Sequence, residues 1–255
     1  MRISIITPTL NNGNFIRECI ESVRSQTIPV EHIVVDGGSK DSTIEILKEY
    51  RNIKWISEPD KGMYDAINKG LKMATGEIVG YLNSDDRYYS DTTYKVLTAF
   101  KRKPTTDFLY GACTYVDNAG KKKYIYTPLP YSNVLLRNMK GIPWAQSSCF
   151  WKAEVHRQIG CFNPALRYCG DYDFFSRLIS NKLSGYRVKS PLSYFMLHEN
   201  ALSVKARAEM QEEFENICSR YGLKRNPFLG FIGQRYFNLI NLDVYCVRIR
   251  EHFRS

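Results

Sequence analysis

Several features that define other protein classes are missing from this sequence of 255 residues. Its seven cysteines are scattered and form no C-x-x-C pair, so the sequence indicates neither a zinc site nor a disulfide framework. A reducing, cytoplasmic setting is therefore the simpler expectation. No apolar run reaches the roughly 18 residues that a membrane-spanning helix needs, and the apolar run at the N-terminus is too short for a signal peptide.

Acidic residues become scarce in the second part of the chain. Residues 1–100 carry 12 basic and 14 acidic side chains, whereas residues 101–255 carry 24 basic and only 12 acidic ones. This excess indicates an anionic partner or surface, or else a solvated basic surface without a partner. Because no nucleic-acid-reading motif accompanies the charge, we do not expect nucleic acid as a partner.

Apolar, β-branched runs alternate with segments of helical period over the first 85 residues. The expected strands are 3–7, 31–35, 53–57 and 77–82. We expect Pro8 to end the first strand, and Ile16, Ile20 and Val23 to form the inner face of the helix that follows. This alternation predicts an α/β fold with a mostly parallel sheet and helices on both faces.

The second half of the sequence is less regular. Strands are expected near 107–112, 124–127, 148–151, 186–189 and 193–197, and helices near 153–159 and 171–181. Two helices, at about 205–221 and 228–252, are expected to close the chain. The length favours one domain with an appended tail.

Polar loops follow the expected strands: TPTLNN, DGGSKDS and NSDD. Ligands of open parallel sheets bind beyond the carboxyl ends of the strands, so we expect these loops to converge on one crevice. In the last loop, Asp85 and Asp86 follow Asn83 and suit a hard divalent cation such as Mg²⁺ or Mn²⁺. The alternative is that either acid only caps a helix or makes a turn.

The DGGSKDS loop is not G-x-G-x-x-G, and Asp36 at its start would repel a pyrophosphate. The carboxylate suits hydrogen bonds from a base NH or a ribose hydroxyl, so a dinucleotide cofactor is not expected. An ordinary strand–turn–helix is the alternative. Further on, GDYDFF places Asp171 and Asp173 at the start of a helix, where either acid complements the helix dipole or acts as a general base.

Four segments of the sequence, taken together, resemble a known protein family. TPTLNNGNFIRECIESVRSQ, VVDGGSKDSTIEIL, SEPDKGMYDAINKGLKMATGEIVGYLNSDD and QIGCFNPALRYCGDYDFFSRL resemble the family 2 glycosyltransferases. The resemblance implies a GT-A fold and inverting transfer of a sugar from a nucleotide-diphosphate sugar, as in bacterial enzymes of O-antigen or capsule synthesis. It covers about residues 1–200, with a nucleotide-sugar half at 1–100 and an acceptor half at 101–200. Residues 201–255 would form a helical extension.

The resemblance also implies roles for particular residues. Those expected to bind the nucleotide sugar are Thr7, Pro8, Thr9, Asp36, Asp60, Asp65, Asn68, Asn83, Ser84, Asp85 and Gln146. The expected ligands of Mg²⁺ or Mn²⁺ are Asp85, Asp86 and His198, and Asp171 is the expected general base. Four positions depart from the usual family pattern: Gly37 and Asn83 stand where relatives often have acids, Ile67 where many have Arg, and Ala145 where close relatives often have His before Gln146.

The basic second half suits an acceptor at a membrane, such as a lipid-pyrophosphate-linked sugar. Residues 228–252 mix large apolar side chains with arginines, which is typical of an interfacial helix at the inner face of a membrane. A helix packed on the domain, or in a homo-oligomer, is the alternative. Two alternatives come from other function classes. A nucleotidyltransferase would need a basic phosphate loop, which TPTLNNGN lacks, and the second alternative is a non-catalytic sugar-nucleotide-binding protein.

Overall fold

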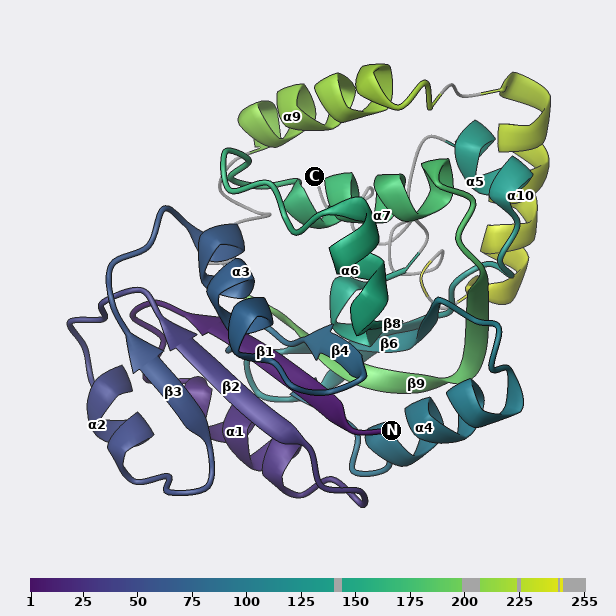
Figure 1. Cartoon of the computed structure of the whole chain (residues 1–255). Helices are drawn as coiled ribbons and strands as arrows, with labels where there is room; N and C mark the ends of the chain where they lie inside the picture. Colours follow the sequence, from purple (N-terminus) through teal and green to yellow (C-terminus); the bar gives the residue numbers. More distant parts are fainter. Residues whose placement is uncertain (140–143, 199–206, 224–225, 243, 245–255) are drawn as a thin grey trace.

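The fold is a central sheet with helices on both faces. The computed structural model describes residues 1–139, 144–198, 207–223, 226–242 and 244 (Figure 1). Its strands follow the order β3-β2-β1-β4-β8-β6-β9-β5, with β7 paired to β6. The α/β fold class predicted from the sequence is therefore confirmed.

The strands of the first half are parallel, as predicted. They are β1 (Ile3–Thr9), β2 (Glu31–Asp36), β3 (Lys54–Ser57) and β4 (Ile78–Tyr81). The expectation that Pro8 ends the first strand is wrong. The Thr9 carbonyl accepts a hydrogen bond on the β2 side, from Gly37, so the Pro8 nitrogen faces the β4 side, where strand pairing extends only to Ile6. Proline removes no ladder bond there.

The strands of the second half extend the same sheet in mixed directions. Antiparallel β8 (Cys149–Lys152) joins β4 to β6 (Phe108–Asp117), and β9 (Gly185–Leu197) lies parallel to β6. The two remaining strands, β5 (Arg87–Tyr88) and β7 (Lys122–Tyr126), pair antiparallel with β9 and β6. The strands expected at 186–189 and 193–197 are thus one strand, with irregular register against β6 between Tyr110 and Cys113.

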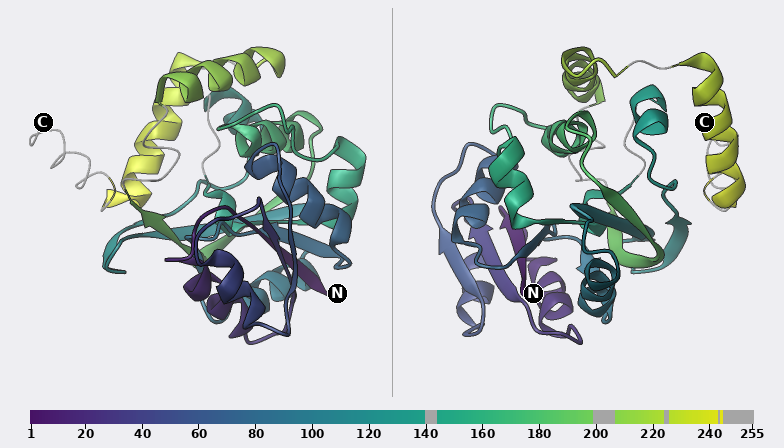
Figure 2. Two further views of the ribbon diagram at one scale, coloured as in Figure 1. Left: turned by 90° about the vertical axis from the view of Figure 1, so that its left-hand side faces the viewer. Right: turned by 45° about the vertical axis from the view of Figure 1, so that its right-hand side comes forward.

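Helices cover both faces of the sheet because neighbouring strand residues point to opposite sides. Ile5 packs with α1 (Ile16–Arg24) and α4 (Thr92–Arg102). Ile6 packs into the larger cluster on the other face. The helices of that cluster are α3 (Met63–Met73), α6 (Ala153–Ile159) and α7 (Gly170–Ser180). Figure 2 shows the two layers in its right-hand view, with α4 below the sheet and α7 above it.

Shorter helices complete the two halves. α2 (Thr43–Lys48) packs against α1, while α5 (Asn133–Met139) and the 3₁₀ turn η1 (Gln146–Ser148) lie between β7 and β8 in the chain. The sequence analysis did not predict α4, α5 or η1.

The C-terminal extension contains α9 (Arg207–Arg220), which packs on α7, and α10 (Pro227–Ile240), which packs on α5. The Asn226 side chain caps α10 by accepting hydrogen bonds from the backbone N–H groups of Phe228 and Leu229. The helix predicted at 228–252 is interrupted at Asn241: α10 ends at Ile240, and Leu242 and Val244 are again helical. Residues 243 and 245–252 of that prediction lie outside the described residues. None of the described helices is both long and apolar enough to cross a membrane.

Candidate active site

The loops that follow β1, β2 and β4 meet at the carboxyl edge of the sheet, as predicted. The Asn12 amide donates to the Ser84 hydroxyl at 2.6 Å, which joins the first loop to the NSDD loop. The first loop also contacts the DGGSKDS loop, because the Asn11 backbone N–H donates to the Ser39 hydroxyl at 2.7 Å. Gly13 adds a backbone N–H bond to Asp41 at 2.9 Å. These bonds join the three loops into one cluster at this edge of the sheet.

Asp36 is buried beneath its own loop. Its carboxylate accepts from the backbone N–H groups of Gly38 and Ser39, both at 2.9 Å, from the Ser57 hydroxyl at 2.7 Å and from the Ser39 hydroxyl. The side chain is fully buried. These donors account for Asp36 as the residue that folds the DGGS turn, and its oxygens are not exposed to the crevice.

Gly37 allows a second carboxylate to approach this turn. A Cβ atom at position 37 would lie 2.5 Å from Asp60 Oδ2, so a larger residue there would displace the Asp60 side chain. Asp60 itself accepts from the Gly62 backbone N–H at 2.9 Å. Relatives often carry a second acid at position 37. Here Gly37 leaves that space to the partly exposed carboxylate of Asp60, which belongs to another loop.

The residues at the end of β1 are buried. The Thr7 hydroxyl lies 2.9 Å from His32 Nε2, which ties β1 to β2. Thr9 Oγ1 is buried and has no hydrogen-bond partner among the described residues. Since Thr9 is the last residue of β1, its hydroxyl lies at the carboxyl edge of the sheet, beside the three loops.

The two acids of the NSDD loop have different surroundings. Asp85 is partly exposed, and its Oδ2 lies 2.9 Å from His198 Nε2, just beyond the end of β9. Asp86 is buried, and its Oδ1 accepts from the Met196 backbone N–H at 3.0 Å. Gln146 Nε2 lies 3.5 Å from the other oxygen of Asp86. Burial, followed by the charge of Asp85, raises the pKa of Asp86 well above its usual range.

The residues around Asp85 fit a divalent cation of the Mg²⁺ or Mn²⁺ type. A carboxylate and an imidazole lie together at the crevice, which suits Mn²⁺ in particular. Asn83 Oδ1 in the same loop is buried without a hydrogen-bond partner in the described part of the chain. Such a cation would take its remaining ligands from a diphosphate and water. No group of three or more His, Cys, Asp or Glu side chains gathers as a complete metal cage within the described ranges.

Asp171 lies in the first turn of α7 and contacts α3. Its Oδ1 accepts from the Tyr172 backbone N–H at 2.7 Å and lies 3.3 Å from the Tyr64 hydroxyl of α3. The Tyr64 hydroxyl is also 3.0 Å from the Tyr168 carbonyl. Loss of hydration raises the pKa of Asp171 above its usual range, which suits a group that must accept a proton.

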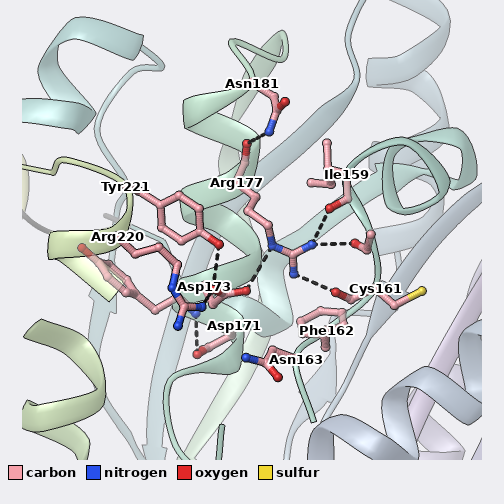
Figure 3. Close-up of polar contacts among 12 residues, drawn as sticks. Ile159, Cys161, Phe162, Asn163, Asp171, Asp173, Arg177, Asn181, Arg220 and Tyr221 are labelled. Atoms are coloured by element: carbon pink, nitrogen blue, oxygen red, sulfur yellow. Dashed lines mark hydrogen bonds and ion pairs between the residues drawn. The ribbon is translucent and has the colours of Figure 1, made fainter. Parts of the chain in front are cut away.

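Asp173, two residues later, has a structural role (Figure 3). It is buried, and it accepts from Arg177 Nε at 3.0 Å and from the Tyr221 hydroxyl at 2.9 Å. The other nitrogens of Arg177 donate to the carbonyls of Ile159, Gly160 and Cys161. Asp173 therefore already binds Arg177 and the Tyr221 hydroxyl, which leaves Asp171 as the better candidate for a base.

The predicted residues of α3 lie beside the crevice with partners of their own. Asn68 clamps the loop before α7, because its amide donates to the Phe162 carbonyl at 2.8 Å and accepts from the Phe162 N–H at 3.0 Å. Asp65 accepts from the Lys61 N–H at 3.1 Å and lies 3.7 Å from Lys69 Nζ. Its partly exposed carboxylate is in the first turn of the helix.

Glu213, which no sequence motif predicts, holds the segment in front of Asp171. Its carboxylate accepts from the backbone N–H groups of Arg167 at 2.7 Å, Tyr168 at 2.9 Å and Cys169 at 2.8 Å. Glu213 belongs to α9, in the C-terminal extension. No motif marks it, because its partners are backbone groups more than 40 residues away in the chain.

Comparisons with known proteins show the family of this chain. The model of the family "Glycosyl transferase family 2" matches residues 4–160. An uncharacterized glycosyltransferase of Rickettsia felis is 30% identical over 188 residues, which cover 69% of this chain and 31% of that protein. The chain therefore spans about a third of the length of this relative.

Solved structures show the same fold. S. aureus TarS 1–349 in complex with UDP-GlcNAc is similar with a TM-score of 0.67 and 22% identity, over 87% of this chain and 65% of that one. The mannosyltransferase PcManGT from Pyrobaculum calidifontis in complex with GDP-Man and Mn²⁺ has a TM-score of 0.66 and 19% identity, over 93% and 70% of the two chains. The GT-A fold expected from the sequence is thereby confirmed.

Proposed function

Because the chain belongs to glycosyl transferase family 2, we propose that it is an inverting enzyme that moves a sugar from a nucleotide-diphosphate sugar to a hydroxyl group. The acceptor is a glycan or a lipid-linked sugar, in the synthesis of a surface polysaccharide such as O-antigen or capsule. The observation that carries the proposal is Asp171: an acid with a raised pKa that starts α7 and contacts α3 of the nucleotide half.

The donor lies over the three loops at the carboxyl edge of the sheet. Asp60, beside Gly37, accepts hydrogen bonds from the nucleotide, and Thr9 and Asn83 offer buried polar atoms that have no described protein partner. The transferred sugar belongs to the hexosyl or N-acetylhexosaminyl class. Similar folds bind UDP-GlcNAc and GDP-Man, which supports a nucleotide-sugar donor without selecting the base.

Asp85 and His198 would hold Mg²⁺ or Mn²⁺ at the diphosphate. When bound, such an ion neutralises the charge that develops on the departing nucleoside diphosphate. In this proposal Asp86 supports the site rather than binding the ion, because its carboxylate is buried and accepts the Met196 N–H. Asp86 therefore fixes the end of β9, from which His198 follows.

The chemical step is a single displacement at the anomeric carbon. Asp171 accepts the proton of the acceptor hydroxyl, while the oxygen of that hydroxyl forms the new bond to the anomeric carbon. The bond to the diphosphate oxygen breaks on the opposite side, and its electron pair leaves with the nucleoside diphosphate. One base is sufficient for this inverting course. Tyr64 and the Tyr172 N–H orient the Asp171 carboxylate.

A donor panel tests the proposal. Purified protein with Mn²⁺ is incubated with UDP- and GDP-linked hexoses and N-acetylhexosamines, and nucleoside diphosphate release is measured. We expect slow hydrolysis of one donor without acceptor, and faster release with a lipid-pyrophosphate-linked sugar. Pyrophosphate release from a nucleoside triphosphate would instead identify a nucleotidyltransferase. Tight donor binding without any turnover would identify a non-catalytic binding protein.

A further inference from the structure

Helix α10 is apolar on two opposite faces. At 100° per residue, Gly230, Gly233 and Phe237 lie on one side of the helix, and all three are buried. The glycines bring this side close to the protein, and Phe237 packs against Tyr126 of β7 with ring centroids 5.1 Å apart. These contacts fix which side of α10 faces outward.

The outward side carries large apolar residues instead of the polar ones that a surface helix normally presents. They are Phe228, Phe231, Ile232, Tyr236 and Leu239, between 42% and 70% exposed, and the series continues past the helix end with Leu242 at 60%. Single exposed apolar residues are ordinary, but a contiguous set on one helix face marks an interaction surface. We call these six residues the outer face of α10.

The charge on this helix has one sign. Arg235 lies within the outer face, its guanidinium 5.0 Å from the centre of the Phe231 ring, and the segment 227–240 contains no acidic residue. In the sequence, Lys224 and Arg225 precede the helix, and Arg248, Arg250 and Arg254 follow it together with the acids Asp243 and Glu251. An apolar surface that carries an arginine, in a segment of net positive charge, matches a layer of acyl chains beneath anionic headgroups.

We propose that the outer face of α10 docks on a membrane surface that contains anionic lipids. A second copy of the chain fits less well. Arg235 lies close to the middle of the 14-residue helix, so antiparallel pairing of two outer faces would bring the two Arg235 side chains together without an acid of the helix to pair with them. On a membrane, the same arginine reaches the headgroups while its neighbours enter the apolar layer.

The surface is argued from α10 alone and does not depend on the proposed transferase activity. It would place the enzyme where a lipid-linked acceptor resides, but vesicle binding is measured without donor or acceptor. Failure to bind vesicles would therefore leave the transferase proposal standing, and a failed donor panel would leave the docking surface standing.

Co-sedimentation of the full chain with vesicles tests the proposal. The vesicles contain phosphatidylcholine alone or phosphatidylcholine with phosphatidylglycerol. We expect binding to the anionic vesicles, weakened about tenfold or more in the double variant Phe231→Ser, Leu239→Ser, because each apolar side chain contributes to burial. Arg235→Gln should weaken binding to anionic vesicles by about fivefold. The control is Tyr94→Ser, an equally exposed apolar position on α4, which should bind as the unmodified chain does.

Light scattering of the same proteins decides between the possible partners of the face. The proposal is wrong if the unmodified chain fails to bind anionic vesicles, or if the double variant binds them equally well. It is also wrong if the unmodified chain is a dimer that the double variant converts to a monomer without vesicle binding in either. Because the substituted side chains are exposed, unchanged thermal melting of each variant will show that the fold is intact.

Discussion

Asp171 and Asp173 lie two residues apart on α7, but their neighbours give them different tasks. Asp173 accepts from Arg177 and Tyr221, whereas Asp171 faces the Tyr64 hydroxyl and a backbone N–H. Their position on the helix does not separate the two, because both stand in the first turn; only the family resemblance favoured Asp171. The distinction comes from Tyr221, which is 48 residues further along the chain.

We expect Asp171→Asn to lower the rate of sugar transfer by about 10³-fold, because the amide cannot accept the proton of the acceptor. Donor and Mn²⁺ binding, measured by calorimetry, should remain within about twofold, since the substitution lies outside the three loops. Substantial turnover by this variant would contradict the assignment of the base.

Tyr64→Phe should move the acidic limb of the pH profile of kcat/KM to higher pH. The base works when deprotonated, and loss of hydration already raises the pKa of Asp171. The Tyr64 hydroxyl opposes this shift by stabilising the charged carboxylate, so its removal raises the pKa further. The variant should then recover most of its activity at higher pH. An unshifted limb would show that Tyr64 does not act on the base.

The acids of the NSDD loop can be distinguished by their response to metal. Asp85→Asn should raise the Mn²⁺ concentration needed for half-maximal activity by at least about tenfold, because it removes the exposed carboxylate beside His198. Asp86→Asn should change it less, since an amide oxygen can still accept the Met196 N–H. A chelator should abolish the activity of the unmodified enzyme. If both substitutions raised the required Mn²⁺ concentration equally, Asp86 would be a metal ligand as well.

At the scale of elements, α9 fixes the start of α7. The Glu213 carboxylate takes three successive backbone N–H groups at 167–169, immediately before the helix that carries Asp171. Gly170 completes this junction, because a Cβ there would lie 2.7 Å from the Tyr64 ring. The proposed base, Asp171, therefore lies between a segment held by α9 and the Tyr64 side chain of α3.

Glu213→Ala should lower kcat and leave the KM for the donor nearly unchanged, because it frees the segment before Asp171 and not the donor loops. The loss of three charge-assisted bonds should reduce the free energy of unfolding by about 2 kcal/mol, seen in chemical denaturation. Glu213→Gln keeps an accepting oxygen and should restore part of kcat. If both variants lost stability without any change in kcat, Glu213 would have only a structural role.

The elements themselves were partly predictable. The parallel strands and their loops follow from β-branched runs and polar breaks, and the structure confirms them. α4 was missed although Thr92, Val96 and Phe100, all buried, already show a helical repeat in the sequence. The partners of Asp36 and Asp86 were not predictable in the same way. Hydrogen bonds that bury an acid in its own turn or against a strand 110 residues away leave no periodic pattern.

At the scale of the whole molecule, buried histidines link the fold to pH. His32 of β2 is buried beside Thr7 of β1, and burial lowers its pKa to about 3. The folded state thus excludes a proton that the unfolded chain binds below about pH 6.5. The contribution of neutral His32 to the free energy of unfolding is therefore fully present above about pH 6.5, and it is lost as the pH falls towards 3.

We expect the free energy of unfolding to fall between pH 6.5 and 4, by up to about 1.4 kcal/mol per pH unit for each excluded proton. His32→Gln should reduce this slope by about one proton. His156, whose pKa burial lowers to about 4, should maintain the rest, so His156→Gln serves as the matched comparison. Urea denaturation at several pH values measures the slope, and an unchanged slope in His32→Gln would contradict the assignment.

The pairing of Asp85 with His198 spans 113 residues of chain, and the Glu213 carboxylate that holds the backbone before Asp171 comes later still. During synthesis, the three loops at the carboxyl edge of the sheet are complete when fewer than 100 residues have been made, but the contacts of Asp85 and of the segment before Asp171 are not yet formed. If the proposed roles of Asp85 and Asp171 hold, a chain that ends before residue 198 would lack the proposed ion-binding pair, and one that ends before residue 213 would carry an unclamped base. The proposed transfer reaction would then begin only after nearly the whole described fold has been made.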